Sequence, residues 1–208
     1  INNAHTGASL TLNTKTVALS GSAADVKAAL TGVTAYTGNI TLDTDHDLAA
    51  LKAINNAHTG ASLTLNTKTV ALSGSAADVK AALTGVTAYT GNITLDTDHD
   101  LAALKTINNA HTGASLTLNT KTVALSGSAA DVKAALTGVT AYTGNITLDT
   151  DHDLAALKTI NNAHTGASLT LNTKTVALSG SAADVKAALT GVTAYTGNIT
   201  LDTDHDLA

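Results

Sequence analysis

The sequence predicts an α/β repeat solenoid, in which stacked coils combine short parallel strands with alanine-rich helices. Three observations predict this fold: a long segment recurs along the chain, each copy alternates strand-like and helix-like patterns, and one copy has few large apolar residues. The segment INNAHTGASLTLNTKTVALSG begins at Ile1, Ile54, Ile107 and Ile160, which gives a period of 53 residues. A fixed period of this size is typical of stacked repeat architectures.

The copies are identical except at the residue that precedes each new copy, which is Ala53, then Thr106 and Thr159. Such identity indicates either very recent duplication or deliberate construction, such as an engineered consensus array. We expect the four copies to form one continuous solenoid. Their bounds are 1–53, 54–106, 107–159 and 160–208, of which the last is truncated.

Each copy contains short runs in which apolar and polar residues alternate, as they do in strands. In the first copy these runs are Leu10–Leu12 and Ile40–Leu42, and we predict a third strand at Thr16–Leu19. Alternate residues of a strand face opposite sides, so Leu and Ile face the core while Thr faces outward. Because helical patterns connect the strands, we expect parallel pairing with right-handed crossovers.

The first helix of each copy has clear start and stop signals. Ser22 followed by Asp25 is a capping box, in which the hydroxyl accepts a backbone N–H and the carboxylate reaches back. Val26 and Leu30 share one face of the predicted helix, and Gly32 supplies the left-handed residue that ends it.

The second helix begins after an acidic segment. Thr44 and Asp47 repeat the capping box, while Leu51 and Ile54 continue the apolar face. Gly60 marks the end of the exit turn. The two strand–helix units therefore predict two coils per copy, and each copy would advance the stack by about 10 Å at a strand spacing of ~4.8 Å.

A single copy has too small a core to fold alone. It offers about a dozen large aliphatic residues, each of which stabilises by roughly 1.5–3 kcal/mol when buried. Ordering the backbone costs on the order of 1–2 kcal/mol per residue. We therefore expect the packing of each copy against its neighbours to supply much of the stability.

The acidic segment DTDHD, Asp43–Asp47, allows two interpretations: a calcium site or a helix cap. An EF-hand loop starting at Asp43 needs Gly at its sixth position and Glu at its twelfth, where this sequence has Leu48 and Ile54. We therefore prefer helix capping and keep a looser calcium site as the alternative; no other cofactor is expected. The candidate calcium ligands are Asp43, Asp45, Asp47, Asp96, Asp98, Asp100, Asp149, Asp151 and Asp153.

Two other polar positions recur with the repeat. If neighbouring strands lie side by side, Lys15 alternates with Asp45 up the stack, which would neutralise a column of like charges. We expect His5 and His46 to be solvated loop residues, with a ladder of metal ligands as the less favoured alternative.

Composition excludes several classes of function. The 16 acidic residues are all Asp and the 11 basic residues all Lys, giving a net charge of −5, so the basic face that nucleic-acid binding needs is missing. No apolar run approaches the ~18 residues that span a bilayer. Cys is absent, which excludes disulfides and thiolate metal sites. The chain opens on Ile1, not Met, so we expect it to be part of a longer protein.

We do not expect an enzyme. Ser, His and Asp all occur, but Ser22 is accounted for as a helix cap. The chain also lacks the G-x-S-x-G turn that presents a nucleophilic serine in hydrolases.

The segments Leu19–Leu30 (LSGSAADVKAAL) and Asp47–Gly60 (DLAALKAINNAHTG) resemble tandem repeats of giant bacterial surface proteins, including cyanobacterial ones. Those repeats similarly pair a TGxxxxL strand with a helix that starts at Ser/Thr-x-x-Asp. The resemblance covers the whole repeat. It implies an extracellular or cell-surface location and an adhesin-like or fibre-forming role, and it supplies no catalytic residues.

Together these observations predict a non-enzymatic structural protein, a rigid rod or a segment of an extracellular filament or stalk. We expect self-association by end-to-end stacking, and neither nucleic-acid binding nor membrane insertion. The alternative is an adhesin module that binds calcium, or that presents its Ser, Thr and Asn residues to a surface or a glycan.

Overall fold

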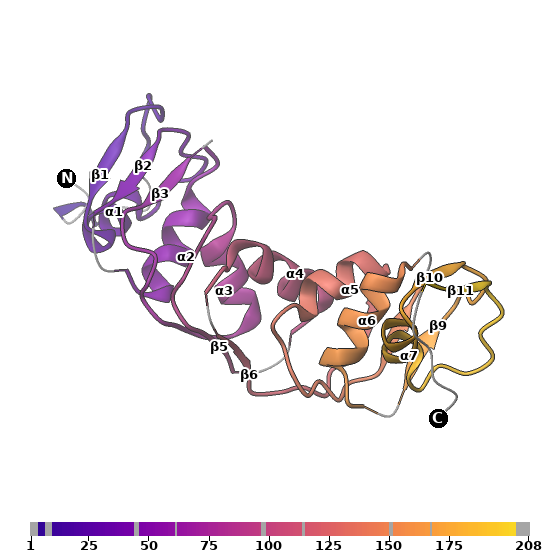
Figure 1. Cartoon of the computed structure of the whole chain (residues 1–208). Coiled ribbons are helices and arrows are strands. Elements are labelled where there is room, and N and C mark those ends of the chain that lie inside the picture. The colour runs from indigo at the N-terminus through magenta and orange to yellow at the C-terminus, as the bar shows by residue number, and fades with distance from the viewer. Residues whose placement is uncertain are drawn as a thin grey trace. The chain divides into compact units, whose positions relative to one another are not determined.

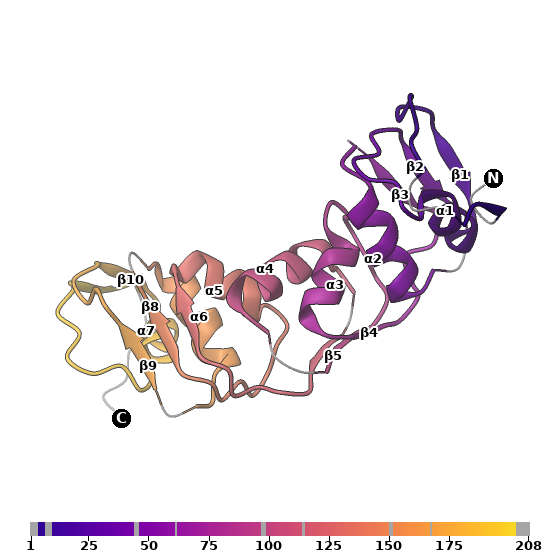
Figure 2. The same ribbon diagram turned by 180° about the vertical axis from the view of Figure 1, so that it is seen from behind.

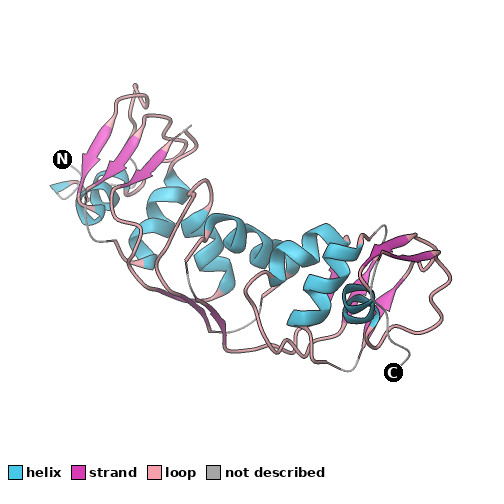
Figure 3. Cartoon of the chain, viewed as in Figure 1, coloured by secondary structure: helices cyan, strands magenta, loops and turns pink. Residues whose placement is uncertain are grey.

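The computed structural model describes residues 4–6, 10–43, 46–60, 62–96, 99–113, 115–149, 152–166 and 168–202. These residues form seven helices and eleven short strands, which alternate along the chain except where two strands follow each other directly (Figures 1 and 3). The chain divides into two compact units. Unit 1 comprises Ile1–Thr97 and Asn109–Thr117, and unit 2 comprises Asp98–Asn108 and Leu118–Ala208.

The predicted α/β class is confirmed, with strand–helix coils that repeat in both units. The elements of unit 1 are β1 (Leu19–Gly21), α1 (Ala23–Leu30), β2 (Ile40–Leu42), α2 (Leu48–Ala57), β3 (Leu63–Leu65), β4 (Leu72–Gly74), α3 (Ala76–Leu83) and β5 (Ile93–Leu95). The elements that cross from one unit to the other are α4 (Leu101–Ala110) and β6 (Leu116–Leu118). The elements of unit 2 are β7 (Leu125–Gly127), α5 (Ala129–Leu136), β8 (Ile146–Leu148), α6 (Leu154–Ala163), β9 (Leu169–Leu171), β10 (Leu178–Gly180), α7 (Ala182–Leu189) and β11 (Ile199–Leu201).

The strands form small parallel sheets. In unit 1, β1, β2 and β3 lie side by side, with Leu19 opposite Ile40 and Ile40 opposite Leu63 (Figures 1 and 2). In unit 2, β7, β8 and β9 repeat this arrangement, and β10 pairs with β11. Because β2 belongs to the first copy and β3 to the second, the predicted pairing of the ITL and LTL strands occurs between consecutive copies.

The predicted strand Thr16–Leu19 was wrong in position, because β1 begins only at its last residue. The preceding carbonyls bind a turn that approaches from Tyr36, so they form no strand ladder. The Tyr36 hydroxyl donates to the Val17 carbonyl. The backbone N–H groups of Thr37 and Gly38 both donate to the carbonyl of Lys15.

Helix α1 starts and stops as predicted. The Ser22 hydroxyl oxygen accepts the backbone N–H of Asp25 at 3.1 Å. Val26 and Leu30 are buried on the same face. Gly32 follows the helix with φ +75°, a left-handed conformation that is strained for residues with a Cβ.

The second helix is capped by a different residue from the one predicted. Asp47, and not Thr44, is the N-cap of α2, and its carboxylate accepts the Ala50 N–H at 2.6 Å. Thr44 itself lies outside the described residues. Leu51 and Ile54 are fully buried, so the predicted apolar face is confirmed.

Alanine allows the helices to pack closely. In unit 1, α2 contacts both α1 and α3, and Ala50, Ala76 and Ala82 of α2 and α3 are buried. Unit 2 repeats the arrangement with α5, α6 and α7. In the part of the chain that the structure describes, the helices are too short or too polar to cross a membrane.

Candidate functional site: the contact between consecutive copies

The contact between one copy and the next recurs along the chain, and we call it the junction. Its first part is backbone pairing. The Ile40 N–H donates to the Ser62 carbonyl at 3.1 Å, and the Asn66 N–H donates to the Leu42 carbonyl at 3.0 Å. The strand β3 of the second copy thereby satisfies the edge of β2 from the first.

A second backbone contact lies beside this strand pair. The Tyr36 N–H donates to the Ala57 carbonyl and the Thr59 N–H donates to the Tyr36 carbonyl, both at 2.8 Å. Equivalent contacts join Tyr89 with Ala110 in unit 1 and Tyr142 with Ala163 in unit 2. The same pairs of groups therefore meet at successive junctions.

A buried histidine and a buried tyrosine form the centre of the junction. The Tyr89 hydroxyl donates to the Val70 carbonyl at 2.6 Å, and its oxygen lies 2.8 Å from Nε2 of His46. A hydroxyl has only one proton to donate, so Nε2 of His46 is assigned as the donor to the Tyr89 oxygen. Desolvation raises the pKa of Tyr89 to about 12, which keeps the hydroxyl protonated.

His46 was predicted to be solvated, and that prediction was wrong: its exposed fraction is 3%. His46 is buried because it contacts Tyr89 of the following copy. The sequence of a single repeat does not show that contact. The same pairing joins His99 to Tyr142 and His152 to Tyr195 in unit 2.

The second recurring histidine also binds across the junction, except in the first copy. Nε2 of His58 donates to the Gly38 carbonyl at 3.0 Å, and His58 is buried. His111 and His164 make the same bond to Gly91 and Gly144. His5, which is exposed as predicted, is the equivalent residue of the first copy.

These buried histidines predict a loss of stability in acid. Burial lowers the pKa of His111 and His164, and the hydrogen bonds to Gly91 and Gly144 oppose this only in part. In the unfolded chain histidine titrates near pH 6.5. Below that pH the unfolded chain binds more protons than the folded one, so stability is complete above about pH 6.5 and falls as the pH drops toward the folded-state pKa.

Urea unfolding at about pH 7.5 and about pH 5.5 checks this prediction. We expect a lower midpoint at the acidic pH, and a smaller difference in the variant His111→Gln, which keeps an N–H donor for Gly91. The matched control is His5→Gln, because His5 is exposed. Equal pH dependence in the wild type and in His111→Gln would contradict the assignment.

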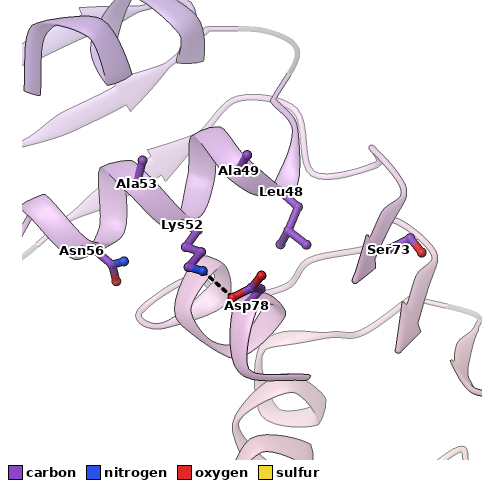
Figure 4. A pocket seen from close by; sticks show the side chains of 7 residues that line it. All are labelled: Leu48, Ala49, Lys52, Ala53, Asn56, Ser73 and Asp78. Carbon is purple, nitrogen blue, oxygen red and sulfur yellow. Dashed lines mark hydrogen bonds and ion pairs between the residues drawn. The ribbon is translucent and has the colours of Figure 1, made fainter. Parts of the chain in front are cut away.

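The helices of consecutive copies are joined at the surface. The Lys52 ammonium forms an ion pair with the Asp78 carboxylate of α3 (Figure 4). Both side chains are about 40% exposed, so the pair contributes at most about 1 kcal/mol. On the same helix, the Asn55 amide donates to the carbonyls of Ala82 and Thr84, which satisfies the end of α3.

A shallow groove of about 500 Å³ lies along α2 next to this ion pair (Figure 4). Its lining residues are Leu48, Ala49, Lys52, Ala53, Asn56, Ser73 and Asp78. The two charged groups of the groove bind each other, so both serve the packing of α2 on α3.

The aspartates that were candidates for calcium have structural partners where they are described. The Asp43 carboxylate lies 3.3 Å from the Ser20 hydroxyl, and Asp47 caps α2. Among the described residues, no group of three or more His, Cys, Asp or Glu side chains is placed to hold a metal ion. The candidates Asp45, Asp98 and Asp151 lie outside the described residues, while Asp100 and Asp153 cap their helices as Asp47 does.

Helix capping predicts that a chelator leaves the protein unchanged. Because the Asp47 carboxylate accepts the backbone N–H of Ala50, we expect the same melting temperature with EDTA as with added calcium. Circular dichroism measures this directly. A rise of several degrees with calcium, reversed by EDTA, would instead support the calcium interpretation.

The lysine of the predicted Lys15–Asp45 column makes a contact that the sequence did not predict. The Lys15 ammonium donates to the Thr34 carbonyl at 2.7 Å. Lys68, Lys121 and Lys174 make the equivalent bond. Asp45 lies outside the described residues, so its pairing stays a prediction.

The chain matches no family model and no curated protein. Function is therefore inferred from the junction. One feature of the sequence could have indicated the histidine–tyrosine contact at the centre of the junction. The chain has four tyrosines and neither Phe nor Trp, and the tyrosines recur at the same place in each repeat.

Proposed function

We propose that this is a non-enzymatic structural repeat protein, in which successive copies build a rod or stalk whose length follows the number of copies. One observation carries the proposal. Ile40 and Leu42 are at most 1% exposed where a following copy covers them, whereas the equivalent Ile199 and Leu201 are 45% and 41% exposed. Each copy thus completes the apolar core of the copy before it.

The repeated side-chain contacts support the same role. Ion pairs equivalent to Lys52–Asp78 occur at Lys105–Asp131 and Lys158–Asp184. Because every copy presents the same groups on its two sides, a copy can be added without a new kind of contact. Stability in such arrays grows as a sum of copy and junction contributions.

We further propose an extracellular or cell-surface location. The support is the resemblance of Leu19–Leu30 and Asp47–Gly60 to repeats of giant bacterial surface proteins. A stalk at the cell surface needs length and rigidity and no catalytic group, which agrees with the use of the polar side chains described above as caps and junction contacts.

Chains with two, four and eight copies test the proposed function. We expect the length, measured by electron microscopy or small-angle scattering, to increase by a constant step of about 10 Å per copy. The urea midpoint should also rise with copy number and then level off. A globular particle at every copy number would overturn the proposal, as would an isolated copy that folds stably as a monomer.

A further inference from the structure

We propose that one asparagine in each copy is an acceptor for an N-linked glycan. The four acceptors are Asn39, Asn92, Asn145 and Asn198. Each is followed by Ile and then by Thr, so each begins an Asn-x-Ser/Thr sequon, the pattern at which sugars are attached to asparagine. The inference rests on the proposed cell-surface location, because this modification is typical of the surfaces of secreted proteins.

Strand geometry exposes the acceptor asparagine. Asn92 lies immediately before β5 and is exposed, whereas the next residue, Ile93, is fully buried. Successive side chains of an extended segment face opposite sides, so Thr94 shares the outer face with Asn92. Burial of Ile93 in the core therefore fixes the two functional side chains of the sequon on the solvent side.

The exposure belongs to copies in the interior of the array. Asn92 is in the second copy and Asn145 in the third, and each of these copies has another copy before it and after it. Both asparagines are exposed, and the isoleucine that follows each of them is fully buried. The arrangement is therefore a property of the repeat itself.

The amide of Asn92 has no structural task that modification would disturb. Within the part of the chain that the structure describes, no hydrogen bond engages the side chain of Asn92 or the hydroxyl of Thr94. Asn55 of the same copy differs, because its amide donates to the carbonyls of Ala82 and Thr84. Nδ2 of Asn92 is thus available to carry a sugar in the folded protein.

The main chain of the sequon is bonded on both sides once the sheet has formed. The Asn92 carbonyl accepts the Leu72 N–H at 2.9 Å, and the Ile93 N–H donates to the Ser115 carbonyl at 3.1 Å. A transferase has to enclose the acceptor segment, and a strand held between two neighbours does not allow this. Transfer therefore belongs to the nascent chain, and the folded copy has only to leave room for the product.

The transfer needs a donor whose sugar is carried on a diphosphate. Nδ2 of the asparagine forms a bond to the anomeric carbon of the sugar, and the bond from that carbon to the diphosphate oxygen breaks. The diphosphate leaves with the bonding electron pair, and Nδ2 releases one proton to a base of the transferase. A lipid-linked oligosaccharide and a nucleotide-activated sugar both supply this leaving group.

The folded copy leaves room for the glycan on a polar face. Ser73 lies opposite Thr94 in the strand register, and its hydroxyl is 3.3 Å from the carboxylate of Asp96. The other face of the same strand is the core face, where Ile93 and Leu95 are fully buried. A glycan on Asn92 therefore leaves the core contacts untouched and adds hydrophilic bulk to the outer face of the sheet.

The test produces the full chain in two settings that differ in the sugar donor. In the first, a cleavable secretion signal directs the chain through the endoplasmic reticulum of a eukaryotic host, where the donor is a lipid-linked oligosaccharide. In the second, the chain is made in bacterial cytoplasm together with a soluble N-glycosyltransferase that uses UDP-glucose. Peptide mass spectrometry then locates the sugars, and the setting that yields them identifies the class of donor.

Substitutions in the second copy separate the sequon from exposure alone. We expect Asn92→Gln and Thr94→Ala each to lose the glycan of that copy and to keep the other three. Thr94→Ser retains the hydroxyl, so it should keep all four. The matched control is Asn66→Gln, which should also keep all four, because Asn66 is exposed but has Lys68 where a sequon needs Ser or Thr. Circular dichroism verifies that each variant has the wild-type fold.

Two results would overturn the proposal. One is a wild-type chain that carries no sugar at Asn92 in either setting. The other is a glycan at Asn92 that persists in Thr94→Ala, which would show that the modification does not read the sequon. Neither result changes the length step per copy, which is measured on chains without sugar, so a failure here is distinguishable from a failure of the proposed function.

Discussion

Replacing Gly91 with Ala is expected to destabilise unit 1 by about 3 kcal/mol, at the upper end of the usual cost of overpacking. An added Cβ would lie 2.0 Å from the carbonyl oxygen of Val70 and 2.8 Å from its carbonyl carbon. The obstacle is backbone, so no side chain can rotate away. The backbone cannot easily retreat either, because the Gly91 N–H and the Thr90 N–H both bind the Lys68 carbonyl.

The matched control is Gly85→Ala, the same chemical change in the same copy. Around Gly85 an added Cβ meets no atom within 4 Å, but φ is +76°, so only a conformational cost of about 1–2 kcal/mol applies. Denaturant unfolding followed by circular dichroism measures both variants. If Gly85→Ala costs as much as Gly91→Ala, steric contact with Val70 is not the reason that Gly91 is required.

Replacing Tyr89 with Phe is expected to cost about 2–4 kcal/mol, because it leaves one buried and one partly buried polar group without their shared partner. The change keeps the ring and removes only the hydroxyl. The Val70 carbonyl then loses its donor and Nε2 of His46 loses its acceptor. The bond to His46 is buried, since Tyr89 is fully buried and His46 nearly so, whereas the bond to Val70 is partly buried.

Tyr195→Phe provides a matched comparison within the same chain. The Tyr195 hydroxyl makes the same bonds, to Val176 at 2.6 Å and to His152 at 2.8 Å. Tyr195 is only half-buried, so water can replace the lost hydroxyl, and we expect a cost of about 0.5–1.5 kcal/mol. Equal losses for the two variants would show that burial at the junction contributes nothing to the strength of this contact.

Helix α1 and the strand Ile40–Leu42 could be predicted from the sequence because the residues that define each of them are close together in the chain. The capping residue Ser22, the buried pair Val26 and Leu30, and the left-handed Gly32 all lie within about three helical turns. The same holds for Ile40–Leu42, where strict alternation defines the strand. The parallel pairing of ITL with LTL strands also followed, since strands joined through helices have few other arrangements.

The junction itself could not be predicted in the same way. His46 and Tyr89 are separated by 43 positions along the chain, and only the strand register brings them together. Without that register, a polar residue in an acidic segment is expected to be solvated, and for His46 this expectation was wrong. The N-cap of α2 was misplaced for a related reason: Thr44 and Asp47 are both good capping residues, and the packing of Leu51 and Ile54 decides where the helix begins.

Helix α2 extends from Leu48 to Ala57 and therefore runs across the position where the sequence repeat starts anew, between Ala53 and Ile54. A gene fragment cut at the repeat boundary splits this helix and leaves its halves on different fragments. A fragment that begins at β1 and ends before β4, with the bounds 19–71, keeps both helices whole. Modules for longer or shorter versions should be cloned in that phase, so that each added cassette carries an undivided pair of helices.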